Sequence, residues 1–186
     1  IRFFYEVNPF YVDTLDGEVI ADFINEIYDS YYKRFKDKLK GFFTDEPQIS
    51  RNGIPWSFII PNEYELEYGE SIFPHLPELF YETADYKLTR IRFWKLITKL
   101  FSKNYMKQIY DWCTKRGLEF TGHFVCEETF ESQLTANGAV MPHYEYFTIP
   151  GIDSLGRRII RDLTAFQIGS AAAQLGKKQV LSESFA

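Results

Sequence analysis

Short apolar runs alternate with longer amphipathic stretches along most of the chain. The apolar runs have the length and character of strands, and they occupy 2–7, 39–44, 118–125, 144–149 and 179–181. Between them, apolar residues recur three and four positions apart, which predicts helices at 18–35, 86–116, 127–138 and 155–175. Strands that alternate with helices are typical of a parallel sheet. We therefore predict the α/β class, with about five parallel strands.

The segment 48–85 departs from this alternation. It contains Gly53, Pro55 and three further prolines, so we predict an irregular excursion with short helices. Long excursions at the carboxyl end of a barrel strand commonly build the substrate pocket. Trp56 lies in this segment, and its ring is a candidate for lining a sugar site.

The balance of charge excludes one class of partner. The formal net charge is −5, and the densest basic stretches, 33–40 and 87–107, mix basic and apolar residues at helical spacing. A surface that binds nucleic acid needs clustered Lys and Arg, so we expect no nucleic-acid partner. The sequence also has no run of about 18 apolar residues, so we expect no membrane span.

Aromatic residues make up 18% of the sequence, which is a high share. Packing of the core explains most of them. Sugar-binding sites are also rich in Tyr and Trp, because aromatic rings stack on the C–H faces of a sugar. Composition alone does not separate these two uses. Cys113 and Cys126 are the only cysteines, and their positions suggest neither a disulfide framework nor a zinc site. We expect two buried free thiols.

Three of the strand-like runs lead directly into acidic residues. Glu46 follows the run at 39–44, and Glu183 follows the run at 179–181 between two serines. Parallel strands bring their carboxyl ends to one edge, where (β/α) barrel enzymes place their catalytic residues, and glycosidases use a pair of carboxyl groups. We predict Glu46 as general acid and Glu183 as base or nucleophile, although each alone also suits a solvated turn or loop.

Other polar residues at the same edge are candidates for binding substrate. Acidic residues are favoured at helix starts, so we expect one of Glu127 and Glu128 to cap the next helix and Glu128 to face the pocket. His123 lies in a strand-like run, and a histidine there is also common in the core or at the rim of a sheet. Asp153 ends the sequence Gly-Ile-Asp, which is also typical of a plain turn. No EF-hand spacing is present, so the residues themselves predict no metal site. The predicted substrate-binding residues are Asp45, Trp56, His123, Glu128 and Asp153.

Six short motifs, taken in order, resemble a known family. They are GFFTDEP (41–47), IPW (54–56), GHFVCEE (122–128), IPGID (149–153), SAAAQ (170–174) and VLSESF (180–185). The set is similar to the large bacterial glycoside hydrolases related to α-L-rhamnosidases, glycoside hydrolase family 106 and its relatives. Each motif alone is loose, whereas their order is fairly specific.

The resemblance implies a catalytic (β/α)8 TIM barrel in a multidomain protein. Residues 1–186 would then be a fragment of a single barrel, approximately strands three to seven. The remaining barrel segments and accessory domains would lie elsewhere in the full-length chain. Asp45-Glu46-Pro47 is similar to the Asn-Glu-Pro that ends the fourth strand in many retaining barrel glycosidases, with Asp in place of the Asn that contacts the sugar 2-hydroxyl. The named family is inverting and calcium-dependent, so the resemblance also implies a possible Ca²⁺ ion.

Two classes of function follow from these observations. The first is a glycosidase that cleaves O-glycosidic bonds in an oligosaccharide or glycoside, with α-L-rhamnosides as the substrates that the resemblance implies. The second is a carbohydrate-binding or scaffold barrel without catalysis. Neither end resembles a natural terminus, so we expect a fragment that is inactive in isolation. The residues do not distinguish a cytoplasmic from a secreted bacterial protein.

Overall fold

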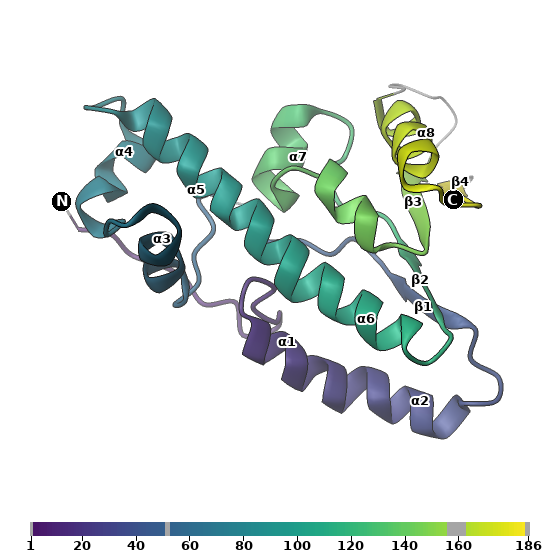
Figure 1. Cartoon of the computed structure of the whole chain (residues 1–186). Helices are drawn as coiled ribbons and strands as arrows, with labels where there is room; N and C mark the ends of the chain where they lie inside the picture. Colours follow the sequence, from purple (N-terminus) through teal and green to yellow (C-terminus); the bar gives the residue numbers. More distant parts are fainter. Residues whose placement is uncertain (1, 51–52, 156–162, 185–186) are drawn as a thin grey trace.

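The described structure contains a four-stranded parallel sheet, which lies at the right of the view in Figure 1. The structure is a computed structural model, and it describes residues 2–50, 53–155 and 163–184. The strands are β1 (Gly41–Thr44), β2 (Glu119–Gly122), β3 (Ile149–Ser154) and β4 (Leu181–Ser184), and they lie in the order β1-β2-β3-β4. All three pairings are parallel. The predicted α/β class is confirmed, and its closure into a TIM barrel stays a prediction.

Two long helical stretches pack beside each other, and Figure 1 shows them running side by side. The first consists of α1 (Gly17–Phe23), a π-helical turn η1 (Ile24–Tyr28) and α2 (Asp29–Phe35). The second consists of α5 (Tyr86–Leu100), the π-helical η3 (Phe101–Lys107) and α6 (Gln108–Thr114). Both match the predicted helices at 18–35 and 86–116. The amide of Gln108 joins them by donating to the Gly17 carbonyl at 3.0 Å.

Local sequence explains where these helices begin and end. The Asp16 carboxylate accepts the backbone N–H of Glu18 at 2.9 Å, which caps the first helix. Gly117 follows the second helix with a φ of +68°, a left-handed conformation that glycine adopts without a side-chain clash. The apolar stripe of the second helix faces inward, where Phe93, Ile97 and Phe101 are fully buried.

The core lies between the long helices and the sheet, and aromatic rings fill much of it. Phe120 of β2 packs on Phe147 with ring centroids 5.0 Å apart, and Phe124 contacts Phe147 at 5.6 Å. Burial of such large apolar side chains is the main source of stability in a domain of this size. Many of the aromatic residues therefore serve packing.

Three short helices lie within 48–85. They are α3 (Ile60–Tyr68), the 3₁₀-helix η2 (Phe73–His75) and α4 (Leu76–Phe80). Both α-helices contact α5. Arg92 of α5 binds the carboxylate of Glu70, which ties the excursion to the long helix. Within the described residues no helix is both long enough and apolar enough to cross a membrane.

Two predicted strands are absent from the described residues at their expected positions. Residues 2–7 form no strand, and Phe4 and Val7 are exposed, because no described strand pairs with this apolar run. The strand predicted at 144–149 is displaced: the 3₁₀-helix η4 (Met141–Tyr146) occupies its first half, and β3 starts only at Ile149. Pro142 in the first turn of η4 explains the helix, since its ring fixes a helical φ.

The last elements also differ in their bounds from the predicted ones. The helix α7 (Phe130–Asn137) lies within the predicted 127–138, and α8 (Leu163–Leu175) within the predicted 155–175. Residues 156–162 of that prediction lie outside the described residues, as does Phe185 of the VLSESF motif. The strand β4 begins at Leu181, where the predicted strand at 179–181 ends.

Candidate functional site

The carboxyl ends of the strands meet at one edge of the sheet. Thr44 at the end of β1 lies beside Gly122 at the end of β2, and Gly122 lies beside Pro150 in β3. Further along β3, Asp153 is paired in register with Glu183 of β4. The predicted acidic residues therefore share an edge, as parallel strands require.

Three side chains converge at this edge, and we call them the acid–histidine cluster: Asp45, His123 and Glu183. His123 Nε2 lies 2.6 Å from Glu183 Oε2 and 3.5 Å from Asp45 Oδ1. His123 is only 1% exposed, whereas the two carboxylates reach solvent. The Phe43 ring meets the imidazole edge-on at a centroid distance of 5.5 Å. The sequence thus placed all three at one edge, but it gave no signal that His123 binds Glu183 directly.

The contact between His123 and Glu183 fixes the direction of the acid. His123 Nε2 and Glu183 Oε2 lie 2.6 Å apart, within hydrogen-bond distance. Because the His123 ring is buried and Glu183 is partly exposed, this contact orients the Glu183 carboxyl group at the edge of the sheet.

Gly122 allows β1 and β2 to converge just before His123. Its φ is +149°, and a β-carbon added there would lie 2.1 Å from the Thr44 carbonyl oxygen. No other residue fits this approach without moving the strands. Because Thr44 precedes Asp45 and Gly122 precedes His123, this contact sets the distance between the two side chains.

Glu46 follows Asp45 in an unusual backbone conformation. Its φ is +45°, which is uncommon for any residue except glycine and costs free energy. The residue is half-buried. Strained residues of this kind cluster at functional sites, where the surrounding structure fixes them. The predicted general acid therefore lies in a strained turn directly after Asp45 of the acid–histidine cluster.

Glu127, rather than Glu128, is the buried acid after β2. Glu127 is 2% exposed, and its Oε1 accepts the backbone N–H of Asp153 at 2.5 Å. Burial raises the pKa of Glu127 to about 8, with smaller contributions from the carboxylates of Asp153 and Glu128. Glu128 is exposed. Sequence reasoning favoured Glu128 for the pocket, and it missed the burial of its neighbour.

The helix cap was also predicted wrongly. Thr129, and neither glutamate, is the N-cap of α7, because its hydroxyl accepts the N–H of Ser132 at 3.1 Å. In return, the Ser132 hydroxyl accepts the Thr129 N–H at 3.2 Å. The sequence signal for this arrangement was Thr followed three residues later by a polar side chain.

Two more predicted binding residues lie in different surroundings. Asp153 is half-buried in β3, and its Oδ1 accepts the Leu155 N–H at 3.1 Å, so its carboxylate stays near the cluster's edge. Trp56 is half-buried and packs against the hydrophobic core.

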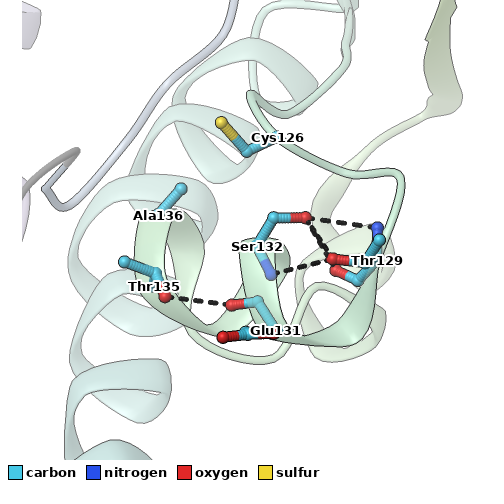
Figure 2. A pocket seen from close by; sticks show the side chains of 6 residues that line it. All are labelled: Cys126, Thr129, Glu131, Ser132, Thr135 and Ala136. Carbon is cyan, nitrogen blue, oxygen red and sulfur yellow. Dashed lines mark hydrogen bonds between the residues drawn. The ribbon is translucent and has the colours of Figure 1, made fainter.

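A shallow pocket of about 330 Å³ lies beside α7 (Figure 2). Its lining residues are Cys126, Thr129, Glu131, Ser132, Thr135 and Ala136. No residue of the acid–histidine cluster lines it, so it is separate from the cluster. Cys126 is exposed here, which corrects the expectation of two buried thiols, whereas Cys113 is buried and burial raises its pKa to about 12.

The donor atoms of the cluster do not fit Ca²⁺ by themselves. One ligand atom from each residue lies within 4.8 Å of the others. However, Ca²⁺ takes six to eight oxygen ligands, and one donor here is an imidazole nitrogen. That nitrogen already binds Glu183 Oε2. We therefore derive no chemical step through a metal ion.

Comparison with solved structures finds a similar fold in a known enzyme. The chain is similar to a rhamnosidase from Novosphingobium sp. PP1Y, with a TM-score of 0.75 and 17% sequence identity. The fold is rhamnosidase-like. The similarity covers 97% of this chain but only 18% of that chain. No family model and no curated protein matches the sequence. At this identity the similarity shows a shared fold, and it assigns no residue a role.

Proposed function

We propose that the chain supplies catalytic carboxyl groups of a glycoside hydrolase that cleaves O-glycosidic bonds. The observation that carries the proposal is the acid–histidine cluster, which joins a residue after β1 to a residue of β4 through His123. The rhamnosidase-like fold supports α-L-rhamnosides as the first substrates to test. The function belongs to the complete protein, because the chain spans 18% of the similar rhamnosidase.

Glu46 is the general acid in this proposal. A carboxylic acid protonates the glycosidic oxygen as the bond to the anomeric carbon breaks, so the leaving sugar departs as a neutral alcohol. The acid must be held rigidly near that oxygen. The turn at Glu46, with its φ of +45°, is suited to this purpose.

Glu183 is the base or the nucleophile. As a base it removes a proton from the water that attacks the anomeric carbon; as a nucleophile it attacks that carbon and forms a glycosyl-enzyme that water then hydrolyses. Both roles need an ionised, oriented carboxylate. The hydrogen bond between His123 Nε2 and Glu183 Oε2 supplies the orientation. Asp45, Glu128, Asp153 and Trp56 are then available to bind sugar hydroxyls or a ring face.

Two variants of the complete protein test these roles with aryl glycosides. Glu46→Gln and Glu183→Gln should each lower kcat by about 100-fold or more, since each removes a proton-transfer or covalent step. The Glu46→Gln loss should grow as the aryl leaving group becomes more basic, because good leaving groups need little protonation. The Glu183→Gln loss should depend less on the leaving group. Glu131→Gln changes an exposed carboxyl on α7 and serves as the matched control.

The outcomes separate the two classes of function. If both variants fold and turn over substrate as the wild-type protein does, the assignment of the acids is wrong. If the wild-type protein binds glycosides in calorimetry but hydrolyses none of them, the protein is a carbohydrate-binding barrel instead.

A further inference from the structure

The buried carboxyl of Glu127 has no part in the chemistry described above. It is 2% exposed, and it lies in the turn between β2 and α7, four residues after His123. Buried carboxyl groups are costly unless they are neutral or hydrogen-bonded. This carboxyl group nevertheless lies buried close to the carboxyl ends of β2 and β3, which suggests that it has a role there.

Its contacts link the elements that carry the proposed site. Glu127 Oε1 accepts the Asp153 N–H at 2.5 Å, and the Glu127 carbonyl accepts the Gln133 side chain at 2.6 Å. Gln133 of α7 in turn pairs with Gln167 of α8 through two hydrogen bonds, of 2.7 and 3.2 Å. The turn after β2 is thus joined to β3 and, through α7, to the helix that precedes β4.

The contact with Asp153 reaches Glu183 through the sheet. Asp153 and Glu183 are register partners in the pairing of β3 and β4. The carboxylate of Glu183 is held separately by His123, which belongs to the same segment as Glu127. The backbone and the side chain of Glu183 are therefore both positioned from the end of β2.

We propose that Glu127 is a positioning residue, which fixes Glu183 for catalysis by holding the β3 backbone at Asp153. This inference rests on the proposed glycosidase function. Glu127 itself touches neither the cluster nor the place of reaction. Glu127 acts by setting the distance and angle between Glu183 and the substrate. Misplacement of a catalytic group by about 1 Å can lower the rate by as much as 100-fold.

Charge in the surroundings adds a dependence on pH. The titratable groups that face Glu127 are Asp153 of β3, Glu128 of the same turn and Tyr144 of η4. None of these is a cation at any pH, and burial favours the neutral acid, so the carboxyl of Glu127 stays protonated at pH 7. Ionisation above about pH 8 places a buried negative charge beside two carboxylates, which should push the turn away from β3.

The test compares three variants of the complete protein in the aryl glycoside assay. Glu127→Gln keeps a neutral acceptor of the same length, so kcat at pH 7 should stay within about threefold. Above about pH 8 kcat should fall less than in the wild-type protein, because the general acid, and no longer Glu127, then sets the alkaline loss. Glu127→Ala removes the acceptor, and kcat should fall about tenfold to 100-fold with a smaller change in KM. Glu131→Gln should leave both the rate and the pH profile unchanged.

An infrared measurement tests the inference without turnover. The wild-type protein should show a band of a protonated carboxylic acid at pH 7 that disappears above about pH 8, and Glu127→Gln should lack this band. If the wild-type protein shows this band but has no glycosidase activity, only the proposed function is overturned. An active protein in which Glu127→Gln keeps the wild-type alkaline profile overturns the positioning role, whether or not Glu127→Ala folds.

Discussion

Glu46, the proposed general acid, has a strained backbone conformation. With a φ of +45°, its β-carbon crowds the backbone, which costs about 1–2 kcal/mol for residues other than glycine. The sequence pattern identified Glu46 as an acid at a strand end, but it could not indicate this conformation. Strained conformations of this kind persist at sites where the direction of a side chain matters for function, even though they lower stability.

Paired substitutions at position 46 measure that strain. Glu46→Ala and Glu46→Gly both remove the side chain, but only glycine relieves the left-handed conformation. We expect the glycine variant to be more stable than the alanine variant by about 1 kcal/mol in denaturant unfolding. At positions with a negative φ, an alanine variant is more stable than a glycine variant. If Glu46→Ala is also more stable than Glu46→Gly, residue 46 does not have the left-handed conformation described.

A second residue-scale prediction concerns His143, which is fully buried between the rings of Phe101 and Phe124. Burial lowers its pKa from 6.5 to about 4, so the folded state binds its proton less readily than the unfolded state. The contribution of neutral His143 to the free energy of unfolding should be fully present above pH 6.5. It should be lost as the pH drops toward 4, by up to about 3 kcal/mol.

The measurement is the free energy of unfolding against pH for wild-type protein and His143→Leu. The raised pKa of Glu127 works in the opposite direction, because its contribution is lost as pH rises from 4.5 toward 8. The difference in slope between the two proteins isolates His143. Equal slopes between pH 4 and 6.5 would show that the histidine is not buried in its neutral form.

At the scale of elements, the long helical patterns were predicted better than the short strand-like runs, of which 39–44 and 118–125 contain strands and 2–7 does not. The helical stretches at 18–35 and 86–116 were predicted because many turns repeat the same apolar stripe. The run at 2–7 has a strand-like composition, but a strand exists only where another strand pairs with it. The choice between Glu127 and Glu128 depended on the left-handed turn at Cys126, whose φ is +56°, and no pattern of apolar residues indicates such a turn.

The close approach of β1 and β2 provides the element-scale prediction. Gly122→Ala would place a β-carbon 2.1 Å from the Thr44 carbonyl oxygen, so the strands must separate, at a cost of about 3 kcal/mol. His123 should move with its strand, and activity should fall. Gly69→Ala is the matched control, because Gly69 also has a positive φ of +74° but nothing within 4 Å, so its cost should be about 1 kcal/mol. Similar losses in both variants would show that the strands are not in close contact.

At the scale of the whole molecule, the sheet orders its strands as a (β/α) barrel does, each beside the next in sequence. Apolar side chains are exposed at both outer strands, with Phe43 in β1 and Val180 just before β4. Further strands of a barrel would cover them. The rhamnosidase-like fold agrees with this arrangement, and the barrel itself stays a prediction.

In the proposed mechanism, Glu46 and Glu183 flank one glycosidic bond. A crystal structure of the complete protein with a bound glycoside or competitive inhibitor tests this most directly, through the distance between the two carboxyl groups. We predict a separation of about 5 Å for a retaining enzyme or about 6.5–9.5 Å for an inverting one, with the scissile bond between them. A separation well above ~12 Å, or a sugar bound away from both acids, would contradict the account.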